Sequence, residues 1–544
     1  MKKFSYTYFI RTAAMLLALV MLSAAAGCSS EDSTLDEREK LREELYGTVE
    51  LLGDDDEGDG YDATTSNFTI AYSKTDSLNP YFCTSTLNDV MSDLIYDSLV
   101  VVDSEFEADF VVAQEKKDLS GRICQMVIRS GLVFSDGSPV TGYDVKYSFD
   151  LAKASASKYA SRLSGINSCM GTETTATFRI ENLDPRAYLL LDFPIVKQGT
   201  ADKATDIPIG SGRYYFHSDS ETGTYLLRND RWYNPNTPSI KRISLVTMPT
   251  VESIIHSIEI GTVSYYYTDL RDGYPSRINA NYAMVDLNDL VYLGINTNDP
   301  RLQSSDVRHA ISYALAREDI ASSAYSGRAY AATGPLTNSW PEAAMAQYGS
   351  TLSSQASAIS FLLAGGYVNE DNNYIRYSID GTKKLNFNLL VNGDNNLQVT
   401  AAQTIAQQLR AVGIDITVSQ AGYADYAARV AAGNYQLYLG EYALLNNMDF
   451  TVLFTPGRGL YTGPSPTDTI NAYNNYIGGA LKLADVIEAF DSDLPFIPIC
   501  YRLGMVCYTR SLSANMDVSE SDHFRNMHLW SPALAESKTE SQPA

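Results

Sequence analysis

The stretch between Leu385 and Val418 constrains the fold of this chain more than any other. It reads LNFNLLV, then LQVTAAQTIAQQLRAVG, then IDITVS. The outer pieces are apolar and predict strands, while the middle piece predicts a helix that ends at Gly413. Two consecutive strands joined by a helical crossover pair in parallel within one sheet. The sequence therefore predicts an α/β fold that contains at least one parallel sheet.

A second stretch, CQMVIRSGLVFSDGSPVTGYDVKYSFD, predicts a strand followed by a tight turn and a helix. Apolar and β-branched residues from Cys124 to Phe134 favour the strand. The Asp-Gly pair that follows offers the positive backbone dihedral of a turn. Thr141 is a suitable helix N-cap, and Asp144 is placed three residues on to accept free backbone N–H groups.

Two further elements are expected in the second half of the chain. SSDVRHAISYALAREDIASSAYSG predicts one helix that Ser305 caps and Gly327 ends. LPFIPICYRLGMVCYT predicts a hairpin that turns at the Leu-Gly step and returns late in the chain to an earlier domain. Such a hairpin would place Cys500 opposite Cys507. Two alternatives then exist, a disulfide between them or two packed free thiols.

The length of 544 residues predicts two or three domains rather than one core. Because the late segment returns to an earlier domain, we expect the chain to cross between lobes more than once. Lobes joined in this way are suited to hinge closure around a cleft.

The N-terminus has the pattern of an export signal. Lys2, Lys3 and Arg11 precede an apolar run that is too short to span a bilayer, and the run leads into SAAAGCSS. The Gly-Cys step resembles a bacterial lipobox, although Ala25 stands where leucine is usual, and it predicts lipidation of Cys28. Ordinary cleavage, which would leave a free Cys28, is the alternative. No other apolar segment is long enough to span a bilayer.

Residues 28–62 are polar and acidic, and we expect them to form a flexible tether after a signal peptide of residues 1–27. Within the tether, GDDDEGDGYD alternates carboxylates with glycine as a calcium loop does. It lacks the final glutamate and the flanking helices of such a loop, so a solvated tether is favoured.

Composition and missing motifs exclude several classes of function. The formal net charge of −24 argues against nucleic acid or an anionic membrane surface as a partner. The histidines form no HExxH, no GxSxG is present, and GRGLYTG lacks the lysine of a phosphate loop. The six cysteines form no CxxC or Cys/His cluster. We therefore expect no catalytic residues, no cofactor and no metal site, and a protein that is not an enzyme.

Several segments, taken in order, resemble the family 5 extracellular solute-binding proteins, the oligopeptide- and dipeptide-binding receptors of bacterial ABC importers. They are SLNPYF, LIYDSLVVVD, VIRSGLVFSDGSPVTGYDVKYSFD, IGSGRYYF with YLLRNDRWYNP, and YLGINTNDPRLQSSDVRHAISYALAREDI, followed by the strand–helix–strand unit. The resemblance covers the chain from about Asn67 to Trp530. It implies a periplasmic-binding-protein type II-like fold with three lobes and a hinged cleft between lobes I and III. The expected bounds are 63–95, 192–290 and 492–535 for lobe I, 96–191 for lobe II, and 291–491 for lobe III.

The resemblance also implies candidate ligand-binding residues. Peptide-binding members hold the ligand's amino group with an aspartate after a strand that ends in Gly-Trp. Here that region reads YLGEYALLNNMDFTVLF, without the tryptophan. Asp449 is the best match and Glu441 the second, and for each the alternative is a solvated loop carboxylate. The stretch YFCTSTLND matches the place where the family pairs backbone with a peptide, so the further candidates are Tyr81, Thr84, Ser85 and Thr86.

The function implied is capture of a peptide-like solute outside the cell and delivery to the permease of an ABC transporter. The protein is expected to be a monomer on the extracellular face of the membrane, held by a lipid anchor on Cys28. The same fold also carries oligosaccharides and metal chelates in other members, so a non-peptide solute is an alternative. Two rival hypotheses are a secreted cell-surface hydrolase and a receptor that signals without transport.

Overall fold

The structure is a computed structural model that describes residues 68–154, 157–219, 223–271, 278–346 and 352–532. The signal peptide, the acidic tether and Cys28 lie outside the described residues. The fold is mixed α/β, as the sequence predicts. No helix among the described residues is both long and apolar enough to cross a bilayer.

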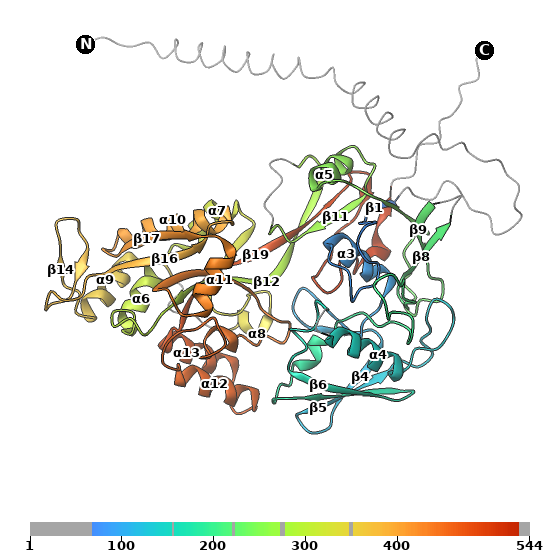
Figure 1. Ribbon diagram of the computed structural model, residues 1–544, viewed down its shortest axis with the longest axis horizontal. Coiled ribbons are helices and arrows are strands. Elements are labelled where there is room, and N and C mark those ends of the chain that lie inside the picture. Colours follow the sequence, from blue (N-terminus) through green and yellow to red (C-terminus); the bar gives the residue numbers. More distant parts are fainter. Residues whose placement is uncertain (1–67, 155–156, 220–222, 272–277, 347–351, 533–544) are drawn as a thin grey trace, which may run out of the picture.

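One large sheet organises the molecule (Figure 1). Its strands follow the order β17-β16-β18-β12-β19-β11-β1-β10-β9-β8, and β13 also pairs with β19. Their bounds are β1 (Phe68–Ala71), β8 (Tyr214–Asp219), β9 (Gly223–Arg228), β10 (Arg242–Val246), β11 (Tyr265–Thr268), β12 (Asn281–Ile295), β13 (Ala329–Ala331), β16 (Asn386–Asn392), β17 (Asp415–Ala421), β18 (Leu437–Ala443) and β19 (Phe496–Tyr508).

Most of the helices follow β12 in the sequence. The helices and 3-10 turns are α3 (Thr86–Ile95), α4 (Gly142–Lys153), η1 (Ala187–Leu190), α5 (Val251–Glu259), α6 (Ser305–Ala314), α7 (Arg317–Tyr325), α8 (Pro341–Ala344), α9 (Gln355–Ala364), α10 (Asn396–Arg410), α11 (Tyr423–Ala431), η2 (Thr451–Leu453), α12 (Thr467–Ile477), α13 (Leu483–Asp493) and η3 (Met527–Leu529).

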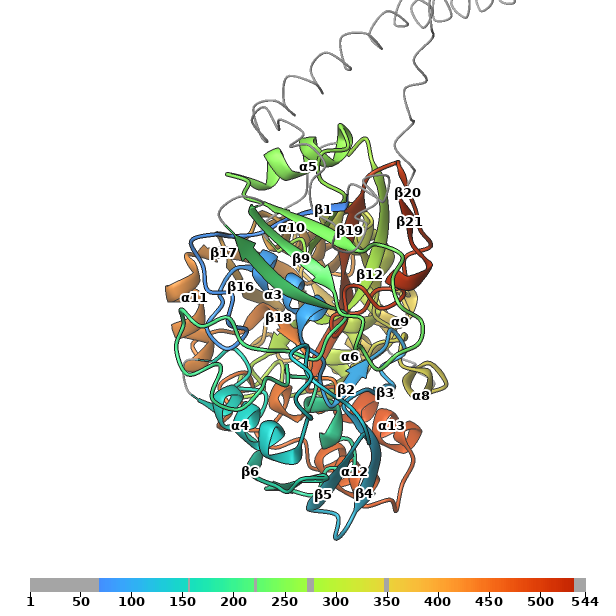
Figure 2. The same cartoon turned by 90° about the vertical axis from the view of Figure 1, so that its right-hand side faces the viewer.

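A separate four-stranded sheet, ordered β4-β5-β7-β6, packs against α4 below the large sheet (Figure 2). Gly142 and Gly171 allow this packing, because a Cβ on either would lie 2.0 Å from a backbone oxygen across the contact. The remaining short strands form pairs. The bounds are β2 (Val100–Val102), β3 (Ala108–Phe110), β4 (Ala113–Asp118), β5 (Ile123–Ile128), β6 (Ile166–Gly171), β7 (Thr175–Ile180), β14 (Asn369–Glu370), β15 (Arg376–Tyr377), β20 (Leu512–Ser513) and β21 (Ser531–Pro532).

The predicted strand–helix–strand unit is confirmed. Strand β16, helix α10 and strand β17 follow one another, and the two strands pair in parallel over their full length. The N-cap is Asn395, whose side chain accepts from the backbone of the first turn. At the other end Gly413 adopts a positive φ of 89°, a conformation that favours glycine and ends the helix.

The predicted hairpin near the C-terminus is wrong. Residues Phe496–Tyr508 form one continuous strand, β19, which pairs antiparallel with β12. Cys500 and Cys507 lie seven residues apart on that strand and are both free and buried. At about 3.3 Å per residue they are separated by roughly 23 Å, far beyond disulfide reach.

Two boundaries also differ from the prediction. The single helix expected after Ser305 is broken into α6 and α7, with Ser304 as the N-cap residue and an extended Leu315 between the helices. The strand expected to reach Phe134 ends at Ile128, and a loop closed by a Val133–Pro139 bridge follows.

Two large hydrophobic cores lie on either side of the region where β12 and β19 pair. One is built mostly from residues between Leu290 and Tyr501, and the other mostly from residues before Val285 and after Val506. Strands β12 and β19 supply residues to both cores and run from one side of the molecule to the other (Figure 1). The expected boundaries of lobes I, II and III remain predictions.

The predicted cap of α4 is confirmed and generates a stability prediction. Asp144 accepts hydrogen bonds from the backbone N–H and hydroxyl of Thr141 at 2.9 and 2.6 Å, and from the N–H of Gln198 at 2.9 Å. Asp144→Ala should lower the free energy of unfolding by about 2–4 kcal/mol, because it leaves these donors without an acceptor.

The matched control is Asp150→Ala on the same helix. Asp150 is exposed and forms an i,i+4 ion pair with Lys146, so its loss should cost less than about 0.5 kcal/mol. Urea unfolding of both variants measures the difference, and equal effects would contradict the capping role of Asp144.

Candidate ligand-binding site

The segment that carries Glu441 is fixed by tight packing between β12 and β18. Gly440 lies opposite Tyr292, and a Cβ on Gly440 would be 2.5 Å from the tyrosine ring. Gly294 stands opposite Tyr438 in the same way, and the two tyrosine hydroxyls are 2.8 Å apart. The two glycines therefore make room for a buried tyrosine pair, which sets the register of β18 just before Glu441.

A charged network crosses the three central strands at this point. Glu441 on β18 pairs with Arg502 on β19, and Asp289 on β12 lies 3.8 Å from the same guanidinium. Asp289 also forms an ion pair with Arg271, at 2.9 Å. Arg502 is 1% exposed and Glu441 15% exposed. Buried charges of this kind require partners, and here each carboxylate has one.

Sequence reasoning missed Arg502, Asp289 and Arg271. A signal for two of them was present. Arg502 interrupts the apolar run PFIPICYRLGMVCY, and Asp289 stands within VDLNDLVYLG. Charged residues are almost never fully buried unless paired. Opposite charges in two apolar strands therefore predict that those two strands lie side by side.

Asp449 lines a cavity of about 540 Å³ between two segments that are far apart in sequence, residues 161–190 and 442–477. The Asn447 side chain donates to Asp184 at 2.7 Å across this boundary. Burial raises the pKa of Asp184, and the Asn447 hydrogen bond opposes that rise. Polar side chains that line the cavity include Arg162, Asp184, Tyr442, Asn447, Arg458 and Tyr473.

The Asp449 carboxylate has hydroxyl and backbone partners, among them the Tyr473 side chain across the cavity wall. One oxygen accepts from the backbone N–H and the hydroxyl of Thr451, at 2.9 and 2.6 Å, where η2 begins. No ion pair of Asp449 is found within the described residues. Burial, and then the negative charge of Asp449, raise the pKa of Tyr473. The carboxylate is half-buried in a cavity wall, and its charge is available to a positively charged group.

The structure places Glu441 and Asp449 in different surroundings. Glu441 is already paired with Arg502 and also accepts from the Gln398 side chain at 3.1 Å. Asp449 lies eight residues further on and is not among the partners of that network. Both remain predicted ligand-binding residues, and Asp449 is the one whose charge is uncompensated.

The candidates near the N-terminus of α3 are already hydrogen-bonded within the protein. Tyr81 is 2% exposed, and its hydroxyl donates to the carbonyl of Pro194. The backbone N–H groups of Thr84 and Ser85 donate to the Asp76 carboxylate, and Ser85 caps α3, which begins at Thr86. Their role in ligand binding remains a prediction. These residues would have to bind a ligand through their backbone carbonyls, or release their present hydrogen-bond partners first.

The segment from Asp184 to Asp192 also touches the body that holds Glu441 at other points. The Arg186 guanidinium stacks over the Trp340 ring at 4.4 Å. The Asn446 side chain donates to Asp192 at 3.0 Å. Leu189 of the same segment is fully buried in the core built mostly from residues between Leu290 and Tyr501, so the contact combines polar, aromatic and apolar groups.

Comparison with known families gives one match that covers most of the chain. Residues 111–457 match the model for bacterial extracellular solute-binding proteins, family 5 Middle.

Curated relatives are distant. The chain is 23% identical to the oligopeptide-binding protein AppA of Bacillus subtilis over 367 residues, which is 62% of this chain and 66% of AppA. It is also 23% identical to a putative ABC transporter peptide-binding protein of Brucella ovis over 211 residues, or 36% of this chain and 40% of that protein. The matched region thus spans less than two thirds of each relative.

Solved structures resemble the fold over a longer range. NikA from Brucella suis, in complex with Fe(III)-EDTA, has a TM-score of 0.66 at 17% identity and covers 85% of this chain and 99% of its own. AppA from Bacillus subtilis, in complex with a nonapeptide, has a TM-score of 0.56 at 17% identity over 86% and 99% of the two chains. The periplasmic murein tripeptide binding protein MppA, in an unliganded open form, has a TM-score of 0.68 at 16% identity over 83% and 95%.

The charged network generates a second stability prediction. Arg502→Met should lower the free energy of unfolding by about 3–5 kcal/mol, because it leaves Glu441 without a cation in a buried site. Arg410→Met is the control. Arg410 pairs with Asp415 at 2.8 Å on the surface, with both side chains more than 40% exposed, so its loss should cost less than about 1 kcal/mol. Urea unfolding that gave the two variants similar midpoints would contradict the importance of the network.

Proposed function

The chain belongs to the bacterial extracellular solute-binding proteins of family 5, and from this premise we propose that it captures a peptide-like solute outside the cell and delivers it to the permease of an ABC importer. The observation that carries the proposal is the cavity between residues 161–190 and 442–477, with the Asp449 carboxylate in its wall. A peptide brings one ammonium group at its N-terminus, and Asp449 has no direct ion pair among the described residues, although Arg162 and Arg458 line the same cavity. Pairing of the two would satisfy both charges as water is excluded.

The proposed mechanism is closure of lobes around the solute. Strands β12 and β19 connect the two cores, and opening about those strands would separate residues 184–192 from Trp340, from Asn446 and from the core that buries Leu189. The closed form then docks on the permease, and the solute leaves unaltered because binding involves no covalent step. The division of the chain into lobes I, II and III is part of this proposal.

A metal chelate is the second candidate ligand, because NikA was solved with Fe(III)-EDTA. Within the described residues no group of three or more His, Cys, Asp or Glu side chains could hold a metal ion. A chelate brings most of its own metal ligands, so this observation opposes a bare ion more strongly than a chelate. The uncompensated Asp449 carboxylate favours a peptide amine over an anionic chelate, which it would repel.

The proposal places the protein on the outer face of the membrane, tethered through residues 28–62. A lipid on Cys28 would hold the chain close to the permease, and the acidic tether would keep the folded part away from the surface.

Asp449→Asn should weaken binding of a peptide with a free N-terminus at least tenfold, since asparagine keeps the cap on Thr451 and loses only the charge. Calorimetry with a pool of random peptides measures the affinity. The control, Asp425→Asn, removes an exposed carboxylate of α11 and should bind as the parent does.

N-acetylated peptides should bind the parent protein weakly. Equal affinity of Asp449→Asn and the parent would discard the proposed role of Asp449, and conversion of the peptides by the parent would instead support a hydrolase.

Cys28→Ala should move the protein from the membrane fraction to the medium of cells that export it, because one lipid-bearing residue is removed. Fractionation and mass spectrometry of the mature N-terminus measure both location and lipidation. Retention of the variant in the membrane fraction would contradict the anchor.

A further inference from the structure

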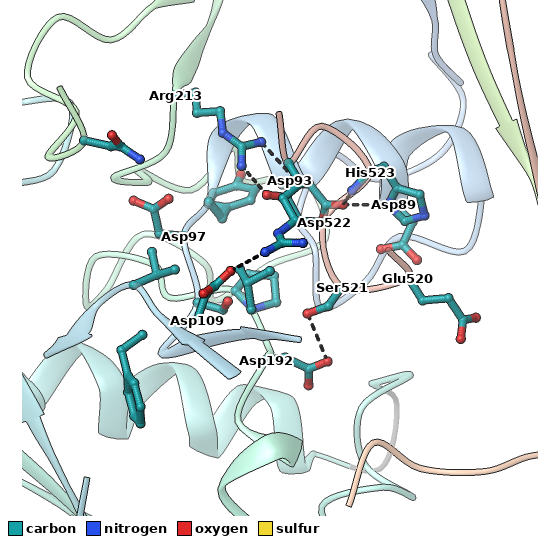
Figure 3. A pocket seen from close by; sticks show the side chains of 18 of the residues that line it. Asp89, Asp93, Asp97, Asp109, Asp192, Arg213, Glu520, Ser521, Asp522 and His523 are labelled. Atoms are coloured by element: carbon teal, nitrogen blue, oxygen red, sulfur yellow. Dashed lines mark hydrogen bonds and ion pairs between the residues drawn. The ribbon is translucent and has the colours of Figure 1, made fainter. Parts of the chain in front are cut away.

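A second cavity, of about 530 Å³, is lined by many charged side chains (Figure 3). It is bounded by α3, by β2 and β3, by residues 158–162, and by the segment 520–525 near the C-terminus. Its wall holds seven carboxylates, four Lys or Arg side chains and one histidine. The acidic groups are therefore in excess even when the histidine carries a proton.

Five of the seven carboxylates have a basic partner across the cavity wall. Figure 3 shows two of these pairs, Asp522 with Arg213 and Asp93 with His523. The five are Asp522–Arg213, Asp93–His523 at 2.6 Å, Asp192–Arg162 at 2.7 Å, Asp109–Arg525 at 2.8 Å, and Asp89–Lys158.

The other two carboxylates, Asp97 and Glu520, have no ion-pair partner within 4.0 Å among the described residues. Asp97 is buried and accepts hydrogen bonds from Ser211 at 2.9 Å and from Trp232 at 3.3 Å. Glu520 is exposed in the cavity and accepts only the backbone N–H of Asn288, at 3.4 Å. With a protonated His523 the charge excess of the cavity resides on these two side chains, and with a neutral His523 the carboxylate of Asp93 adds to it.

An independent observation comes from His523, which lines the same cavity and is 8% exposed. Its Nδ1 lies 2.6 Å from Asp93, so a proton on Nδ1 is held by that carboxylate. Its Nε2 is buried and has no hydrogen-bond partner among the described residues. In this tautomer Nε2 is an unused acceptor, and an N–H donor from a solute would satisfy it.

Glu520 connects this cavity to the charged network. Its hydrogen bond reaches Asn288 on β12, which is next to Asp289. Arg162 lines both this cavity and the cavity that holds Asp449, so the two cavities are neighbours and one solute could present groups to both.

We infer that this cavity receives a cationic group of the solute, an ammonium or guanidinium such as a lysine or arginine side chain carries. The inference rests on the proposed function, since it assigns a side-chain preference to the same solute. A cation would meet Glu520 first, and the field of Asp97 and the N-acceptor of His523 would hold it there. An anionic or apolar group would leave the excess carboxylates uncompensated, so it would be bound less well.

The cavity also gives the preference a pH dependence. The protein that surrounds Glu520, and then the charge of Asp289, raise the pKa of this carboxyl to about 7, although the side chain itself is open to the cavity. The Asn288 N–H, Arg271 and His523 act in the opposite direction. Glu520 is therefore partly protonated at neutral pH, and a cation binds its ionised form. Affinity for a cationic solute should rise from pH 6 to pH 8 in the parent protein.

The test compares two pools of random peptides with the same range of lengths. One fixed position holds lysine in the first pool and norleucine in the second. Calorimetry at pH 8 should show the parent protein binding the lysine pool at least tenfold more tightly. In Glu520→Gln and in Asp97→Asn the preference should fall below about threefold, and in Glu520→Gln the rise with pH should disappear. Glu173→Gln, which alters an exposed glutamate between β6 and β7, should retain the preference of the parent.

Equal binding of the two pools by the parent would overturn the inference and leave the proposed function intact. A lysine preference that survives in both Glu520→Gln and Asp97→Asn would also overturn it, because the cation would then bind elsewhere. Failure of the parent to bind either pool would overturn the proposed function together with the inference.

Discussion

The pairing of β12 with β19 is the constraint on which the rest of the structure depends. These two strands contribute to both large cores, so the arrangement of each half is fixed relative to the same ladder. The ladder is irregular between Asp286 and Leu290, where the register shifts. At this point the backbone of Asn288 pairs outside the β12–β19 ladder. Its N–H donates to the Glu520 side chain, and its carbonyl accepts from the N–H of Leu444. Buried backbone groups need such partners, so both neighbouring segments are tied to the irregular point.

Charge is arranged around that point in a consistent way. Arg502 on β19 and Arg271 in the segment after β11 pair with Glu441 and Asp289, so these two carboxylates of the ladder are compensated. Uncompensated carboxylates line the two cavities further out, Asp449 on one side and Glu520 on the other. Carboxylates that face solvent are screened by water and salt. Those in cavities are screened less, and under the proposed function they set which solutes bind.

Local patterns predicted those parts of the fold that local physics decides. The crossover from β16 to β17 follows from apolar strands, one helix and a glycine stop, and the cap of α4 follows from Thr141 and Asp144. The hairpin at Leu503-Gly504 failed because tertiary packing overrides the turn signal. A Cβ on Gly504 would lie 3.2 Å from the Leu287 side chain, so this glycine permits close approach rather than a turn. The candidate site residues remain predictions, and the charged groups around them, such as Arg502 near Glu441, could not be predicted locally because they come from segments far apart in sequence.

The fold alone does not decide the solute. Structures solved with a nonapeptide and with Fe(III)-EDTA resemble this chain at the same 17% identity, so one backbone arrangement serves chemically different ligands. Discrimination must then come from side chains in the cavities, because a specific site rejects a solute chiefly by leaving its own buried polar groups unpaired. In this chain those groups include the carboxylates Asp449 and Glu520 and one imidazole nitrogen, which N–H donors that carry positive charge would satisfy, beside Arg162 and Arg458, which they would not. The same groups oppose a solute whose outer surface is anionic, and this is the physical basis for favouring a peptide amine over a chelate.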